Sequence, residues 1–347
     1  MSKNPKIEFF KIHLEPTPNN HNITFKSVFQ KIYVSDHPDC IIADVNNEAL
    51  QQNFFRYFFK KIDTVFNNDE KKRKAFYAKS DLIDGQIVTP INISVENSTI
   101  DGIIKGGIYD TGKDLGDMAN PQDDTESLNE NKILLDNFYF SLYTPLNKDI
   151  GILALHSYTR DQVADVFKPF IERLFKISQY SYKAVATLFM PIEMQEAFKQ
   201  NSIIKKFQFS NRVIVNDMED GVLLNGEFTV QIQITSLGNQ INLNNLPYWK
   251  RKFGESVLGL PNKPERSLGT FNNQFGYVHS PGGKKNDTRF ILNAENIEIT
   301  ATLFLENYIT IEENGTPNWE ELKIFTTQTI NEIIKPEVYP EDYINEN

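Results

Sequence analysis

Near its middle the chain reads Asn137-Phe138-Tyr139-Phe140-Ser141-Leu142-Tyr143, and after a six-residue connection it reads Ile150-Gly151-Ile152-Leu153-Ala154-Leu155-His156-Ser157. Both runs are apolar and aromatic-rich, have the length of strands, and are joined by a segment that contains proline and asparagine. They predict an antiparallel β-hairpin. The apolar residues that follow recur at helical spacing and predict a helix that covers the sheet: Val163, Val166, Phe167, Phe170, Ile171, Leu174 and Ile177.

The N-terminal part adds a strand and a long helix. Residues 6–14 alternate in the manner of a strand, which Pro16 and Pro18 end. Residues 46–66 carry apolar side chains, five of them Phe, at helical spacing, and Asn46 or Asn47 is suited to be the N-cap. The apolar face of this helix is wide. We therefore expect it to be covered on more than one side, either by the domain core or by a second protein.

The C-terminal part is richer in strands. Residues 203–216 and 227–235 predict a pair of strands connected by 217–226, and residues 297–311 alternate over a long stretch. A helix is predicted from Thr316 and Pro317 to Pro336, followed by a frayed acidic tail. The fold class that results is α+β, with a mixed N-terminal half that contains the hairpin-plus-helix unit and a strand-rich C-terminal half closed by one helix.

The length of 347 residues predicts two domains. We place the boundary between an N-terminal α/β region, 1–132, and a C-terminal α+β region, 133–347. Residues 106–130 are rich in Gly, Asp and Asn and predict an acidic, flexible loop at the end of the first region.

Charge is segregated along the chain. Residues 295–347 carry twelve acids against two lysines, and this local balance equals the net charge of −10 of the whole protein. Residues 199–290 instead carry twelve Lys and Arg against seven Asp and Glu. Clustered like charges create local potentials that a net charge averages away. The acidic end could therefore screen the basic region, and removing residues 336–347 would then tighten the binding of a polyanion.

Composition limits the chemistry. Cys40 is the single cysteine and the five histidines are scattered, so we expect no disulfide, no metal site and no cofactor. The apolar runs are far shorter than a bilayer requires, so we expect a cytoplasmic protein without membrane contact. The abundance of Asn, Lys, Ile and Phe suggests an AT-rich bacterial genome.

Catalytic signatures are weak, and the sequence favours a protein that is not an enzyme. Residues 107–113 fit the spacing of a phosphate-binding loop, but Asp114 stands where Ser or Thr must hold magnesium. A degenerate metal-dependent nuclease is an alternative, with the carboxylates Asp217, Asp220 and Glu227 as its candidate residues. Thr229 occupies the position where such a site needs a lysine, and hairpin-turn residues are the simpler interpretation.

The basic region contains the main candidate site. Aromatic and cationic residues interleave there in a pattern that suits nucleic-acid strands or another polyanion: Trp249, Lys250, Arg251, Lys252, Lys263, Arg266, Lys284 and Lys285. The alternative is a solvated, lysine-rich loop. We expect a non-catalytic binding subunit of a prokaryotic intracellular system, for which antiviral defence is one setting. A scaffold subunit or homo-oligomer that uses the Phe-rich helix 46–66 as its contact is the rival hypothesis.

Overall fold

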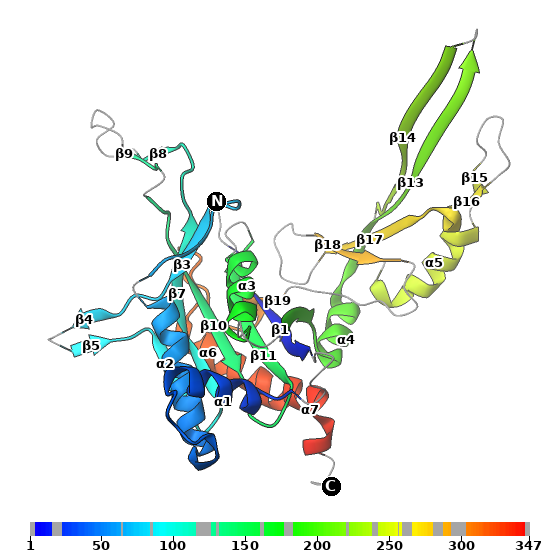
Figure 1. The fold of residues 1–347 in the computed structure, drawn as a ribbon. Coiled ribbons are helices and arrows are strands. Elements are labelled where there is room, and N and C mark those ends of the chain that lie inside the picture. The colour runs from blue at the N-terminus through cyan, green and yellow to red at the C-terminus, as the bar shows by residue number, and fades with distance from the viewer. Residues whose placement is uncertain are drawn as a thin grey trace. The chain divides into compact units, whose positions relative to one another are not determined.

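The computed structural model describes residues 4–15, 23–63, 65–83, 86–115, 126–129, 132–159, 163–176, 183–219, 222–237, 242–255, 257–258, 266–279, 287–292 and 303–343 (Figure 1). Contacts divide the chain into two compact units. Unit 1 comprises Met1–Phe189 and Leu303–Asn347, and unit 2 comprises Met190–Thr302. Both units combine helices with antiparallel strands, which confirms the predicted α+β class.

The main sheet of unit 1 has the strand order β12-β1-β11-β10-β7-β3-β2, and each neighbouring pair is antiparallel. Its strands are β1 (Pro5–Glu15), β2 (Asn67–Asp69), β3 (Lys74–Tyr77), β7 (Thr99–Ile108), β10 (Asp136–Tyr143), β11 (Ile150–Tyr158) and β12 (Lys183–Phe189). Two further short strands, β6 (Ile91–Ser94) and β19 (Leu303–Phe304), pair with β7 and β1. The predicted hairpin at 137–157 is confirmed as β10 and β11 in the middle of this sheet.

The connections explain how the sheet is assembled. Helices α1 (Phe25–Asp36) and α2 (Asn47–Ile62) follow β1, and α3 (Ala164–Leu174) joins β11 to β12. Without the strands inserted between α2 and β10, the chain order is β-α-β-β-α-β and the strand order is β12-β1-β11-β10. This is the ferredoxin-like, split βαβ arrangement. The insertion also holds two small hairpins, β4 (Asp81–Ile83) with β5 (Gln86–Val88) and β8 (Asp114–Leu115) with β9 (Glu126–Ser127).

One face of the sheet forms a phenylalanine-rich core with α1, α2 and α3. Phe54 of α2 stacks on Phe29 of α1 at 4.1 Å between ring centres, and Phe58 of α2 contacts Phe140 of β10 and Phe170 of α3. Phe54, Phe55 and Phe58 are fully buried. The helix predicted at 46–66 is confirmed with Asn46 as its N-cap. The core of its own unit covers these three rings, so the partner contact expected for residues 46–66 stays a prediction that concerns the other side chains of the segment.

The opposite face of the sheet is covered by the C-terminal helix. This helix consists of α6 (Trp319–Gln328), a π-helical segment (Thr329–Ile334) and α7 (Lys335–Val338). Lys323 of α6 pairs with Asp101 of β7 at 3.2 Å, and Lys335 lies 4.0 Å over the ring of Tyr143. Pro336 does not end the helix as predicted, since it stands in the first turn of α7, where proline is tolerated.

The segment after this helix is ordered rather than frayed up to Tyr343. Tyr339 is 3% exposed and donates a hydrogen bond of 2.7 Å to the carbonyl oxygen of Ile150. A short 3-10 helix (Pro340–Asp342) follows, and its carboxylates pair with Lys148 in the β10–β11 connection at 2.8 and 2.7 Å. The acidic end therefore makes its described ion pairs inside unit 1.

Unit 2 is built on a four-stranded antiparallel sheet of order β14-β13-β17-β18. Its strands are β13 (Ile203–Glu219), β14 (Val222–Thr235), β17 (Asn273–His279) and β18 (Asp287–Ile291). The helices are α4 (Ile192–Asn201) and α5 (Leu246–Glu255), and a small pair is formed by β15 (Val257–Leu258) and β16 (Arg266–Ser267). Strands β13 and β14 are long and form a hairpin that extends beyond β17 (Figure 1).

The domain organisation differs from the expected boundary at 132/133. Strands β10 and β11, which lie after that position, pair with β7 and β1, which lie before it, so the boundary would cut through one sheet. The contacts instead separate 190–302 as an insertion within unit 1. Sheet pairing between distant segments, which leaves no signature in local composition, causes the difference.

Two local predictions are corrected. Residues 106–108 belong to β7 rather than to a flexible loop, and a Cβ atom at Gly107 would come within 1.7 Å of the carbonyl oxygen of Leu134, which only glycine permits. Part of the predicted strand 297–311 lies outside the described residues, and Leu305–Asn307 forms a 3-10 helix. No helix in the described part of the chain is both long and apolar enough to cross a bilayer.

Candidate nucleic-acid interface

The sheet of unit 2 has two chemically different faces. Along β13 the buried residues Phe207 and Phe209 alternate with the more exposed Lys206, Gln208 and Ser210. The register between β13 and β14 places Ile232 and Ile234 on the apolar face. It places Gln231 and Gln233 on the polar face. The residues on the polar face are half-buried or exposed, so this face is accessible on the described part of unit 2.

The centre of the polar face combines a cation with aromatic rings. Lys206 Nζ lies 4.4 Å from the centre of the Tyr277 ring, and these two residues are register partners of β13 and β17. The Tyr277 hydroxyl donates a hydrogen bond of 3.2 Å to Oε1 of Gln208. Phe275 shares the face two residues away on β17 and is half-buried. An ammonium beside ring faces offers both phosphate neutralisation and base stacking.

Arg212 extends this surface along β13. Its side chain is 70% exposed and forms an ion pair with Glu227 on β14. An exposed ion pair of this kind is worth little in water, so a phosphate group can replace the carboxylate at small cost. The cations of this face thus lie at positions 206 and 212 of one strand, an even offset that keeps them on the same side.

The predicted cations of α5 do not form one compact patch. Lys250, Arg251 and Lys252 are exposed and Trp249 is half-buried. Consecutive helix positions are rotated by about 100°, so the three cations fan over about 200° around the helix. Arg266 lies in β16, where its side chain is not described, and Lys263, Lys284 and Lys285 lie outside the described residues.

Three of the four cations in the second basic run of the sequence, Lys71–Lys74, are engaged within unit 1. Lys74 pairs with Asp165 of α3 at 3.0 Å, and Lys72 donates to the Asp165 carbonyl oxygen at 2.6 Å. Arg73 lies 3.5 Å from Asp110. These contacts join β3 and the turn before it to α3 and to the residues that follow β7. They reduce the availability of the three cations for an external ligand.

Of the three carboxylates of the nuclease alternative, the structure describes one side chain, that of Glu227. The backbone of Asp217 pairs with that of Leu224 across the hairpin, but the Asp217 side chain is not described. Glu227 is paired with Arg212, and Asp220 lies outside the described residues. Among the residues that the structure describes, no group of three His, Cys, Asp or Glu side chains could hold a metal ion.

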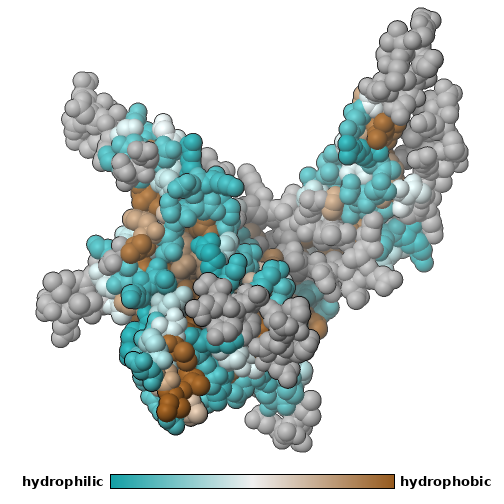
Figure 2. Space-filling view, viewed as in Figure 1, coloured by the Kyte–Doolittle hydropathy of each residue, from teal (hydrophilic) through white to brown (hydrophobic). Residues whose placement is uncertain are grey.

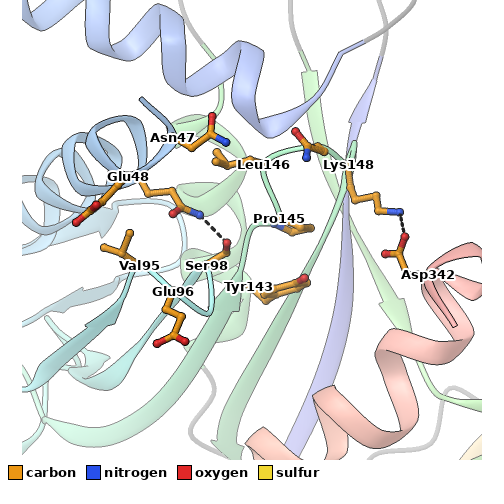
Figure 3. Close-up of a pocket in the computed structure, with 12 residues that line it drawn as sticks. Asn47, Glu48, Val95, Glu96, Ser98, Tyr143, Pro145, Leu146, Lys148 and Asp342 are labelled. Carbon is orange, nitrogen blue, oxygen red and sulfur yellow. Dashed lines mark hydrogen bonds and ion pairs between the residues drawn. The ribbon is translucent and has the colours of Figure 1, made fainter. Parts of the chain in front are cut away.

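A cavity of about 830 Å³ in unit 1 has the opposite electrostatic character (Figure 3). It lies between the start of α2, the β6–β7 turn, the β10–β11 connection and the C-terminal segment. Glu48, Glu96 and Asp342 line it, and its cation, Lys148, already holds Glu341 and Asp342. Such a lining disfavours a polyanion. The hydrogen bond of 2.5 Å from Gln51 Nε2 to Ser98 Oγ joins two of its walls.

His156 lies in the interior of unit 1 rather than at an accessible site. It is fully buried on β11, its ring meets the Trp319 ring edge-on at 5.5 Å, and neither ring nitrogen has a hydrogen-bond partner in the described structure. Burial, together with the nearby Lys6 ammonium, lowers the pKa of His156 to about 3. The side chain is therefore neutral at physiological pH and cannot reach an external ligand.

The residues of the polar sheet face were missed by the sequence analysis, although a signal for them was present. The sequence Lys206-Phe207-Gln208-Phe209-Ser210 alternates polar and apolar residues. That pattern predicts one buried and one accessible face, but Tyr277 and Phe275 join it only through the pairing of β17 with β13.

The two units differ in charge. Residues 190–302 carry twelve Lys and Arg against eleven Asp and Glu, whereas the remainder carries 24 against 35. The net negative charge of the protein thus belongs to unit 1. Comparisons with family models, with curated proteins and with solved structures give no match.

Proposed function

We propose that this protein is a non-catalytic binding protein that engages single-stranded nucleic acid through the polar sheet face of unit 2. The observation that carries the proposal is the ammonium of Lys206 over the Tyr277 ring, on an accessible face that Phe275 and Arg212 share. Single strands are bound where cations follow the phosphate backbone and aromatic rings stack on the bases. Amide side chains beside these rings can accept and donate hydrogen bonds at base edges.

Charge distribution supports this choice of surface. Unit 1 repels polyanions through its excess of eleven acids, and the second face of its sheet is occupied by α6. Unit 2 has no such excess of acids, and the described polar face of its sheet is accessible. Lys250, Arg251 and Lys252 of α5 add cations to the same unit, where they would raise the local concentration of an anionic ligand.

Binding is tested by fluorescence anisotropy with labelled single-stranded and double-stranded DNA and RNA over a salt series, with and without magnesium. We expect retention of single strands at low salt and a linear fall of log affinity with log salt concentration. Replacing Lys206 with Ala should reduce the steepness of this dependence by about one. Absence of retention at low salt would exclude the proposal, and magnesium-dependent cleavage would instead favour the nuclease alternative.

A further inference from the structure

Strand β14 is an open edge of the unit 2 sheet. It pairs with β13 over 14 residues and has no other strand partner in the part of the chain that the structure describes. Its residues from Glu227 to Gln231 are exposed. A strand edge presents a row of backbone donors and acceptors that can pair with another strand.

Three other edge strands in the described part of the chain are short or carry charged residues, whereas β14 is long and nearly uncharged. The edge strand β2 has three residues and is followed by Lys71 and Lys72, β12 begins with Lys183 in an ion pair with Glu15, and the five residues of β18 include Asp287 and Arg289. Short length and charge are the usual means of blocking edge pairing. Strand β14 is long, contains neither lysine nor proline, and has Glu227 as its one charged residue.

The outer part of the β13–β14 hairpin has no third strand beside it among the described residues. Strand β17 pairs with β13 only as far as Ser210, so beyond that point β13 and β14 form a two-stranded ribbon. Phe228 is 56% exposed there and Val230 is 38% exposed, and Figure 2 shows hydrophobic atoms on the described part of this arm. A two-stranded ribbon is marginally stable in water unless further strands or another surface cover it.

The strand is complementary to a second copy of itself. Its apolar residues Phe228, Val230 and Ile232 occupy one face and Thr229, Gln231 and Gln233 the other. Two identical strands that pair antiparallel are related by a two-fold axis perpendicular to the sheet. The apolar faces of both copies therefore lie on one side of the joined sheet, and the polar faces lie on the other. Apolar side chains then meet apolar ones and amides meet amides. With the axis at Gln231, Val230 stands opposite Ile232 and Glu227 opposite Thr235, so like charges do not face each other.

We propose that two copies of the chain associate through their β14 edges, in antiparallel register near residues 227–233, to form one continuous sheet. The backbone ladder supplies the attraction and the alternation of the two faces sets the register. A homodimer of this kind is isologous, with the same surface used by both partners. The polar faces of the two sheets become continuous, although the association itself does not depend on any ligand.

The first experiment uses cysteine cross-linking of the full chain without nucleic acid. In a Cys40→Ser background, single cysteines replace residues 227 to 233 one at a time, and the protein is mildly oxidised. A disulfide needs two Cα atoms within about 7 Å, which identical positions satisfy only close to the two-fold axis. We therefore expect covalent dimers at one or two positions and a steep decline on both sides. Ser210→Cys is the control, since it shares the polar face but lies one strand inside the edge, so it should not cross-link.

The second experiment measures molar mass by light scattering from low to high micromolar concentration. We expect a concentration-dependent dimer, weakened about tenfold by Gln231→Lys combined with Gln233→Lys, because the new charges lie near one another across the edge. Ser210→Lys places a charge on the same face away from the edge and should leave the dimer unchanged. Circular dichroism verifies that each variant is folded. A single-chain mass at every concentration, equal cross-linking at Ser210 and at the edge, or a dimer insensitive to the edge lysines would each overturn the proposal.

Discussion

Lys206 Nζ stands 4.4 Å from the centre of the Tyr277 ring, although 70 residues separate them in the sequence, because antiparallel pairing makes the two residues register partners of β13 and β17. The Tyr277 hydroxyl is also bonded to Gln208, which limits the motion of the ring. The cation and the ring are thus held together before a ligand arrives. Such preorganisation reduces the entropy that binding must cost.

The first prediction concerns this pair. Tyr277→Ala removes a stacking surface worth about 1 to 3 kcal/mol per base, so we expect single-strand affinity to fall about tenfold or more. Tyr277→Phe retains the ring and should retain most of the affinity. Tyr248→Ala removes an exposed tyrosine of α5 in the same unit and is the matched control. If Tyr277→Ala and Tyr248→Ala bind equally well in anisotropy titrations, the polar sheet face is not the binding surface.

The second prediction concerns His156 and pH. The folded-state pKa of about 3 is below the ordinary value of 6.5, so the unfolded chain binds a proton that the folded chain does not. Stability is therefore complete above about pH 6.5 and declines as the pH falls toward 3, by about 2 kcal/mol between pH 7 and pH 5. Urea unfolding across this range measures the slope.

His156→Phe is the comparison for this pH dependence. The variant retains an aromatic ring beside Trp319 and removes the titrating group, so its stability should vary less between pH 7 and pH 5. The Lys6–Glu8 ion pair remains in both proteins. An unchanged slope in the variant would assign the pH dependence to other groups.

The third prediction separates core from contact surface on the Phe-rich segment. Phe54→Ala removes a fully buried ring that stacks on Phe29, and we expect a loss of about 3 to 5 kcal/mol. Phe66→Ala removes a ring that is 46% exposed and should cost far less. Chemical denaturation of both variants gives the comparison. Similar losses would contradict the burial seen for α2.

The fourth prediction concerns the C-terminal segment. Tyr339→Phe removes the buried hydrogen bond to the Ile150 carbonyl and should cost about 1 kcal/mol in thermal or urea unfolding. Glu341→Gln with Asp342→Asn removes only partly exposed ion pairs to Lys148 and should cost less.

The same double variant tests whether the acidic end screens the basic region. Because the two carboxylates are held by Lys148, we expect the affinity for single-stranded nucleic acid to remain unchanged. Tighter binding by the variant in the anisotropy assay would instead support screening, as the charge segregation of the sequence suggests.

The sequence by itself determined the α+β class and the elements with a strong local period. The hairpin of β10 and β11, the strand β1 and the helix α2 follow from alternation and helical spacing, which depend on neighbouring residues alone. The pairing of β13 with β14 was predicted for the same reason, although the strands extend through the residues expected to form their connection.

Only the tertiary structure decided which of these faces are covered. The wide apolar face of α2 is compatible with a core or with a partner, and the packing of Phe29, Phe140 and Phe170 against its buried rings assigns those rings to the core. The polar face of β13 gains Tyr277 from a strand 70 residues away, and the unit boundary depends on β11 pairing with β1. Local periodicity determines that a strand or helix has one apolar and one polar face. What lies against each face is set by long-range pairing and burial, which depend on the whole chain at once.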